Sequence, residues 1–186
     1  FLYQQNTIRD ALVAGLTLNI FHEHNDRVVM ANIAQIVNVL QSVILTEGEK
    51  MLLTPTYHVF NMYKVHQDAE RLDAHISGSE YEMDGEKIPQ VSVSASKDAE
   101  GKIHVSLCNV SHDSQADVSV ALRGLGGPIF KIKAEQLAAD SLDAHNTFEE
   151  PDALTPSTFS AYEVEEGVLH AKLAPMSVTV FEITAG

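Results

Sequence analysis

Three side-chain amides follow a short apolar run in the first quarter of the chain. The run is Val28 to Met30, and Asn32, Gln35 and Asn38 come after it in the sequence ANIAQIVN. This order is typical of a buried parallel strand that ends in a functional loop, because the chemistry of a β/α barrel lies at the carboxyl ends of its strands. The three amides are therefore the first candidates for contacts with a ligand.

A second group of candidates carries side chains that bind metals. His22 and His24 lie two residues apart in HEHND, with Glu23 and Asp26 beside them. A zinc site needs three or four converging ligands, whereas here the chain turns from a helix toward a strand. In a β/α barrel such a turn lies at the amino-terminal ends of the strands, the face that serves stability and not catalysis. We interpret this segment as a solvated turn, expect no metal, and exclude Glu23 as a catalytic acid.

Two further motifs have the composition of active sites without the required context. Ser111, His112 and Asp113 are the members of a catalytic triad, but adjacent residues point in different directions, and triads are assembled from separate segments of a chain. The glycine-rich run at 124–127 precedes Pro128 and a predicted strand, where a phosphate loop needs a helix. We interpret both motifs as turns.

The composition is that of a globular protein with an acidic surface. The 186 residues are 45% hydrophobic, and 12 basic against 26 acidic side chains give a net charge of −14. This sign disfavours nucleic acid, anionic lipid and acidic polysaccharides as partners and leaves neutral ligands open. No apolar run approaches the roughly 20 residues of a membrane span, and the single Cys108 cannot form an internal disulfide. We expect a cytoplasmic protein without membrane or nucleic-acid partners.

Two helices are predicted on either side of the amide loop. The first begins at the capping-box pattern of Thr7 and Asp10 and runs to about residue 22, and its apolar residues cover more than one stripe, which predicts burial on most sides. The second begins at Thr54 and Pro55, an N-cap followed by proline at the first helical position, and reaches about residue 65. A turn is expected between them at 46–50.

Residues 1–66 thus read as helix, strand, long loop and helix, which is about one and a half β/α units. Such a piece cannot close a barrel or cover both faces of a parallel strand. Either the chain is a piece of a longer protein, or another chain supplies the remaining strands.

From residue 67 onward the hydrophobic period changes from helical to alternating, and the boundary is expected near 67–72. The segments 90–96 and 102–110 alternate with period two around a turn, which predicts a hairpin. Further strands are predicted at 117–122, 129–137, 161–164, 168–173 and 178–183. This spacing is typical of an antiparallel β-sandwich. The expected fold class is α/β followed by all-β: the last β/α units of a TIM barrel in 1–66, then a jelly-roll-like sandwich in 67–186.

The stretch from residue 6 to residue 66 closely resembles the end of the catalytic barrel in glycoside hydrolase family 51, the intracellular α-L-arabinofuranosidases. The elements DALVAG, HNDRV, ANIAQIVNV and TPTYHVF stand in the family's order, and DAHNTFEEPD followed by LAPMSVTVFEI resembles its carboxyl-terminal sandwich. The resemblance spans nearly the whole chain, and the motifs are strongly specific in this order and spacing.

The resemblance implies a retaining glycosidase, in which two glutamates about 5–5.5 Å apart act as acid/base and nucleophile. Family members carry them on earlier barrel strands, in an Asn-Glu pair and in an Asp-Glu-Trp context. This chain contains no tryptophan and no Asn-Glu pair. We therefore expect no catalytic residue in this chain, which would be the carboxyl-terminal part of the enzyme and inactive alone.

One family position carries over. Gln35 in ANIAQIVNV matches the family's glutamine that hydrogen-bonds the arabinofuranosyl unit, and an amide with two donors and an acceptor suits the hydroxyls of a neutral sugar. The alternative is an amide that braces the loop. Asn32 and Asn38 are weaker candidates, expected to hold the loop from behind.

The resemblance implies an enzyme that removes terminal arabinofuranosyl units from arabinan, arabinoxylan or their oligosaccharides, without metal or cofactor. Its expected partners are these oligosaccharides, the missing amino-terminal part of the same protein, and further copies of itself in a homo-oligomer, a hexamer by resemblance. Two alternatives stay open: a non-catalytic carbohydrate-binding or assembly sandwich, and β-glucan cleavage within the same family.

Overall fold

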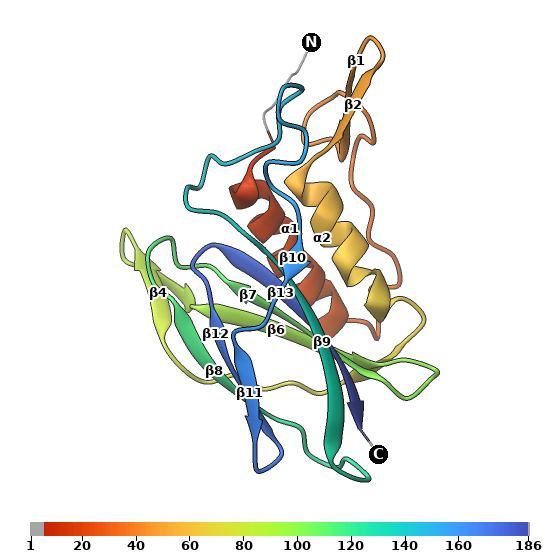
Figure 1. Ribbon diagram of the computed structural model, residues 1–186, viewed down its shortest axis with the longest axis vertical. Coiled ribbons are helices and arrows are strands. Elements are labelled where there is room, and N and C mark those ends of the chain that lie inside the picture. The colour runs from red at the N-terminus through yellow and green to blue at the C-terminus, as the bar shows by residue number, and fades with distance from the viewer. Residues whose placement is uncertain (1–5, 186) are drawn as a thin grey trace.

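The computed structural model describes residues 6–185, in which two helices pack on one face of a β-sandwich (Figure 1). Helix α1 spans Ile8–Glu23. Helix α2 spans Pro55–Tyr63 and continues into a short 3-10 helix, η1, at Lys64–His66. Neither α-helix of this described part is long and apolar enough to cross a membrane.

Both α-helices begin at the predicted caps. The amide and the hydroxyl of Thr7 donate to the Asp10 carboxylate at 2.8 and 2.9 Å. The hydroxyl of Thr54 accepts the amide of Tyr57, and proline occupies the first helical position. These bonds use groups near helix starts that have no partner within the helix, which explains why the sequence located both starts.

The β-sandwich is antiparallel, as the alternating hydrophobic pattern predicts. Its larger sheet has the order β10-β9-β13-β7-β6-β3 and consists of β3 (Glu70–Leu72), β6 (Val91–Lys97), β7 (Ile103–Asn109), β9 (Ile129–Ala138), β10 (Ser157–Thr158) and β13 (Ser177–Ala185). The smaller sheet, in the order β11-β12-β8, consists of β8 (Ala116–Ala121), β11 (Tyr162–Glu165) and β12 (Val168–Leu173). Every strand predicted from the alternation is present, and within these two sheets only the short edge strands β3 and β10 were missed.

The two central strands, β7 and β13, are buried on both faces. Toward the smaller sheet, Phe181 and Leu107 cluster with Leu169. Toward the helices, Val178 and Cys108 belong to a second apolar cluster that includes the buried side chains of α1 and α2. The helices and the larger sheet therefore share one core, and removal of this apolar surface from water is the main force that holds them together.

Only one face of α1 is buried, which corrects the expectation of burial on most sides. Its buried positions are Ile8, Ala11, Leu12, Gly15, Leu18 and Asn19. Val13 and Ile20 are 58% and 54% exposed, because the described residues cover α1 mainly from the side of α2 and the larger sheet.

The predicted buried strand at 28–30 is not formed. This segment has no regular structure, and Val29 and Met30 are 91% and 71% exposed. A parallel strand requires hydrogen-bonded neighbours, and residues 6–185 place none beside it. The described residues therefore do not show the expected last β/α units of a barrel.

Two small hairpins were not predicted as strands. Strands β1 (Ile44–Glu47) and β2 (Lys50–Leu53) pair around the turn expected at 46–50, and β4 (Glu80–Met83) and β5 (Glu86–Pro89) pair around the turn at 84–85. The β1–β2 hairpin projects beyond α2 at one end of the molecule (Figure 1). Both hairpins are largely exposed and do not alternate clearly, so their period gave no strand signal.

Candidate functional site

The loop that carries Asn32, Gln35 and Asn38, called the amide loop here, has an unusual backbone. Gln35, Asn38 and Leu40 have φ angles of 57°, 62° and 54°, which place three non-glycine residues within six positions in the left-handed region. Each such residue costs on the order of 1 kcal/mol or more, so the surrounding structure must hold it there. Strained backbone of this kind concentrates at binding and catalytic sites.

The loop is held against strand β1. The amide of Ile44 donates to the carbonyl of Ile36, and the amide of Asn38 donates to the carbonyl of Ile44, both at 3.0 Å. The Asn38 side chain adds two bonds to Thr46: its amide group donates to the hydroxyl at 2.8 Å, and its carbonyl oxygen accepts the backbone amide at 2.6 Å. Asn38 is thus a loop brace, and its amide is fully engaged.

Gln35 lies on the exposed part of this loop. Its side-chain amide makes no hydrogen bond to any other residue of the described chain. The loop therefore presents an amide with free donors and a free acceptor. Within residues 6–185, the Gln35 side chain therefore does not brace the loop, which was the alternative to a sugar contact.

Asn32 lies apart from the other two amides, at a small cavity of about 240 Å³. The cavity opens between the exposed side of α1, the start of α2 and the segment 31–33. Its walls are mostly apolar, with Val13, Phe21 and Phe60 among them, and Gln41 adds a second amide. The structure therefore does not bring Asn32, Gln35 and Asn38 together into one pocket.

The triad-like motif is a turn closed on itself, as expected. The Ser111 hydroxyl donates to the Asp113 carboxylate at 3.0 Å and accepts the amide of Ser114. His112 lies 3.8 Å from the other oxygen of Asp113. The serine hydroxyl bonds the carboxylate and not the imidazole, so the serine–histidine contact of a triad is absent from this motif.

The expected metal-free turn needs one correction. Residues 6–185 contain no group of three or more histidine, cysteine or acidic side chains able to hold a metal ion. His22, however, is not part of a solvated turn: it lies in the last turn of α1, and its Nδ1 is 2.7 Å from the hydroxyl of Ser94. The sequence analysis placed His22 and His24 in the same turn, whereas only His24 lies beyond the end of α1.

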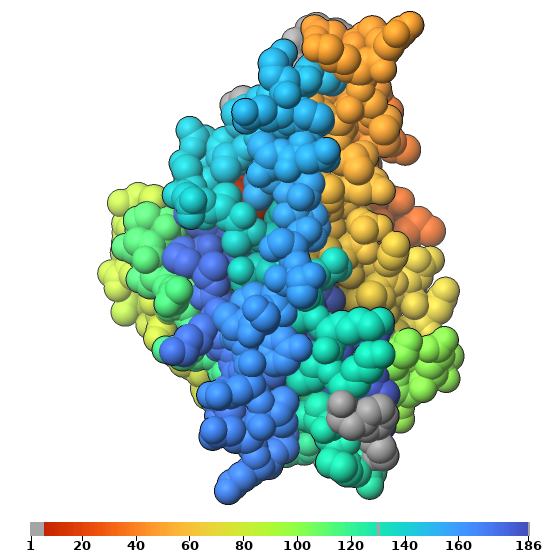
Figure 2. Space-filling model, in the orientation of Figure 1, coloured from red at the N-terminus to blue at the C-terminus, as the bar shows by residue number. Residues whose placement is uncertain are grey.

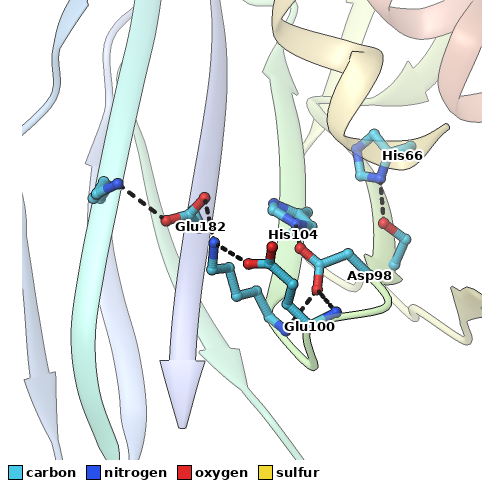
Figure 3. Close-up of polar contacts among 8 residues, drawn as sticks. His66, Asp98, Glu100, His104 and Glu182 are labelled. Atoms are coloured by element: carbon cyan, nitrogen blue, oxygen red, sulfur yellow. Dashed lines mark hydrogen bonds and ion pairs between the residues drawn. The ribbon is translucent and has the colours of Figure 1, made fainter. Parts of the chain in front are cut away.

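His22 belongs to a polar layer between the helices and the larger sheet that the sequence reading missed. His66 is its centre: Nδ1 is 2.7 Å from the Ser96 hydroxyl, and Nε2 is 2.6 Å from the Ser106 hydroxyl. Figure 3 shows the His66 ring with one of these contacts. The ring centroids of His22 and His66 are 4.7 Å apart. A signal for this layer was present, because serines at alternate positions of QVSVSAS share one face of a strand.

The electrostatics of this layer keep its histidines neutral. The pKa of His66 is lowered to about 3, mainly by burial and to a smaller extent by repulsion from the neighbouring rings of His22 and His104. Burial also lowers the pKa of His22. Because each serine hydroxyl can donate or accept, neutral imidazoles satisfy the layer in either tautomer.

The deeper end of the layer holds the only cysteine. The Tyr63 hydroxyl donates to the Asn19 carbonyl oxygen at 3.0 Å and lies 3.3 Å from the Cys108 sulfur. Burial raises the pKa of Cys108 to about 12 and raises that of Tyr63 well above its ordinary value. A thiol that stays protonated and buried is not a nucleophile, so this group is part of the core.

Figure 3 also shows acidic side chains near the edge of this layer, and each is paired. Burial works to raise the pKa of Asp98, but its bonds from His104 and from the amides of Lys102 and Glu100 outweigh this and lower the pKa. Glu182 lies 3.4 Å from Lys133 and 3.9 Å from Lys102. These carboxylates close a turn and link strands on the sandwich surface, and none serves a hydrolytic pair.

Comparison with protein families gives a match to the description "Alpha-L-arabinofuranosidase C-terminal domain" over residues 1–177. Among curated proteins, the chain is 45% identical over 183 residues to an intracellular exo-α-L-arabinofuranosidase of Bacteroides ovatus, covering 98% of this chain and 35% of that protein. It is 28% identical to an intracellular exo-α-(1→5)-L-arabinofuranosidase of Streptomyces lividans, covering 92% of this chain and 26% of that protein. The chain thus spans between about a quarter and a third of the length of these relatives.

The fold agrees with this relationship. The crystal structure of the GH51 arabinofuranosidase from Xanthomonas axonopodis pv. citri superposes with a TM-score of 0.94 and 41% identity, covering 99% of this chain and 37% of that one. These comparisons do not favour a free-standing carbohydrate-binding module. The chain belongs to the α-L-arabinofuranosidase C-terminal domain family, as the resemblance of its motifs to the family 51 enzymes predicted.

Proposed function

We propose that the chain is the carboxyl-terminal part of a retaining exo-α-L-arabinofuranosidase that removes terminal arabinofuranosyl units from arabinan, arabinoxylan or their oligosaccharides. One observation carries this proposal: the family match extends over residues 1–177, and the Bacteroides ovatus relative, 45% identical, is named for this activity. The same name includes the word intracellular, which supports a cytoplasmic location. The family resemblance supports a homo-oligomer, and a hexamer in particular.

Within this chain, Gln35 is the proposed contact with the arabinofuranosyl unit. Its amide is exposed and unengaged, and its backbone is held in a left-handed conformation. An amide can donate to one sugar hydroxyl and accept from another, which a charged side chain cannot do. The braced Asn38 acts on the loop, and Asn32 acts at the neighbouring cavity wall.

The amino-terminal part of the same protein is proposed to supply the acid/base and nucleophile glutamates and the remaining barrel strands. Residues 1–66 then form the carboxyl-terminal portion of the barrel, and residues 67–186 form the sandwich that supports it. Exposed apolar side chains support this proposal, because α1 and the segment after it expose Val13, Ile20, Val29, Met30 and Ile36. Covering such surface is worth roughly 25 cal/mol per Å².

The test compares the 186-residue chain with the full-length protein on 4-nitrophenyl α-L-arabinofuranoside and on a β-glucan. We expect the full-length protein to release 4-nitrophenol and arabinose, and the 186-residue chain to release neither. Hydrolysis of the β-glucan alone would reassign the substrate. Turnover by the purified 186-residue chain would contradict the assignment of both glutamates to the amino-terminal part.

A further inference from the structure

The amide loop is attached to the β1–β2 hairpin by a compact set of hydrogen bonds next to Gln35. The amide of Ile44 donates to the carbonyl of Ile36, and the carbonyl of Ile44 accepts the amide of Asn38. These two bonds form a parallel bridge between Ile44 and Val37. Two residues further along β1, Thr46 exchanges two bonds with the Asn38 side chain. Four hydrogen bonds thus fix Ile36 and Asn38 of the loop to Ile44 and Thr46 of β1.

These bonds act directly on the conformation of Gln35. A non-glycine residue in the left-handed region relaxes to negative φ unless its neighbours prevent it, and such a change turns its side chain to another direction. Asn38 has the same backbone strain and is one of the residue types that tolerates it. Its side chain closes the loop onto β1 just after Gln35, where backbone freedom would move the amide most.

We propose that Asn38 and Thr46 are positioning residues that hold the Gln35 amide toward the sugar, so that the β1–β2 hairpin is a working part of the substrate site. This inference rests on the proposed function of Gln35. It assigns to Thr46, and to a hairpin that looks like a surface decoration, a role in recognition of the arabinofuranosyl unit. A misplacement on the order of 1 Å at such a contact can cost about 100-fold in rate.

The alternative is that the Asn38–Thr46 pair only stabilises the chain. The two roles differ in what they change. A stabilising pair alters the melting temperature and leaves the kinetics of the folded enzyme intact. A positioning pair alters kcat/KM of the folded enzyme, and it does so only while Gln35 is present.

The experiment uses the full-length enzyme with four substitutions in the Asn38–Thr46 pair and a fifth as a control. Asn38→Gly removes the side chain and keeps a backbone that accepts positive φ, whereas Asn38→Asp retains the oxygen that accepts the Thr46 amide. Thr46→Val removes the hydroxyl that accepts from Asn38, and Thr46→Ser retains it. Asp84→Gly is the matched control, because Asp84 is also left-handed but lies in the exposed β4–β5 turn.

Steady-state kinetics on 4-nitrophenyl α-L-arabinofuranoside and thermal melting are measured for each variant. We expect Asn38→Gly and Thr46→Val to lower kcat/KM by about tenfold or more. Asn38→Asp, Thr46→Ser and Asp84→Gly should stay within about threefold of the wild type. We also expect Asn38→Gly to add little further loss in a Gln35→Ala background, because both changes then remove the same contact.

The outcomes separate this inference from the proposed function. If Gln35→Ala lowers kcat/KM and Asn38→Gly does not, the positioning role is overturned while the sugar contact stands. If the two losses multiply in the double variant, Asn38 acts on something other than Gln35, and the inference is again overturned. If Gln35→Ala itself leaves kcat/KM unchanged, the proposed sugar contact fails, and the positioning role fails with it.

Discussion

His22 and His66 lie ring against ring at the joint between the helices and the larger sheet, with their centroids 4.7 Å apart. Each binds a serine hydroxyl of β6, and the contact therefore connects α1, η1 and the sandwich. Burial lowers the pKa of both rings, so both are neutral in the folded chain. Protonation of these two histidines at low pH is consequently expected to destabilise the packing of the helices on the larger sheet.

The pH dependence of stability follows from this pair. The pKa of His66 falls from 6.5 in the unfolded chain to about 3 in the folded chain, so its contribution is complete above pH 6.5 and is lost as pH falls toward 3. The full linkage is on the order of 5 kcal/mol, and less to the extent that solvent reaches the half-buried ring. We expect His66→Gln to flatten the fall in unfolding free energy between pH 7 and pH 4.5 in urea denaturation. Parallel curves for His66→Gln and for the exposed control His75→Gln would contradict this.

Gly15 allows α1 to approach the larger sheet closely. A Cβ at this position would lie 2.8 Å from the buried sulfur of Cys108 and 3.4 Å from the hydroxyl of Tyr63. We expect Gly15→Ala to destabilise the chain by about 1–3 kcal/mol, although alanine favours helix over glycine by roughly 1 kcal/mol. In the double variant with Cys108→Ala, the loss should be smaller than the sum of the single losses by at least about 1 kcal/mol. A stabilising Gly15→Ala would show that the helix is not held against the sheet at this distance.

Asn146 connects the long segment after β9 to the end of β2, just before α2. Its carbonyl oxygen accepts the amide of Leu154 at 2.6 Å, and its amide group donates to the carbonyls of Leu53 and Leu154 at 2.8 and 3.0 Å. Figure 2 shows the segment around 140–156 lying alongside the β1–β2 hairpin. We expect Asn146→Ala to lower the unfolding free energy by about 3 kcal/mol, because it leaves buried backbone groups without partners.

The neighbouring Thr147 provides the control for this prediction. Its hydroxyl accepts one exposed amide, that of Glu150. Thr147→Ala should therefore cost less than about 1 kcal/mol in the same urea denaturation. Equal losses for Asn146→Ala and Thr147→Ala would show that the buried bonds of Asn146 contribute no more than a surface turn.

Local signals in the sequence predicted most of the fold. The caps at Thr7 and Thr54 and the alternation in β6 to β9 and in β11 to β13 depend on neighbours within the same segment, and the structure places these elements within about two residues of their predicted ends. The strand at 28–30 failed because its stability depends on neighbouring strands that the described chain does not provide. The layer around His66 was missed because it joins side chains from η1, β6 and β7 that are far apart in sequence.

The candidate site was less accessible to sequence reasoning. Gln35 was located by its resemblance to a family motif, and chemistry explained only why an amide suits that place. The left-handed backbone of Gln35 and the bonds between Asn38 and Thr46 depend on how a loop closes onto a hairpin. Periodicity carries no information about either feature.

The most direct test of the central claim is the kcat/KM of Gln35→Ala in the full-length enzyme on 4-nitrophenyl α-L-arabinofuranoside, beside the exposed control Gln67→Ala. Loss of one polar contact of about 1–3 kcal/mol predicts a decrease of roughly 5- to 150-fold for Gln35→Ala and no change for Gln67→Ala. An unchanged kcat/KM in a folded Gln35→Ala enzyme would contradict the claim that this chain supplies a wall of the sugar pocket.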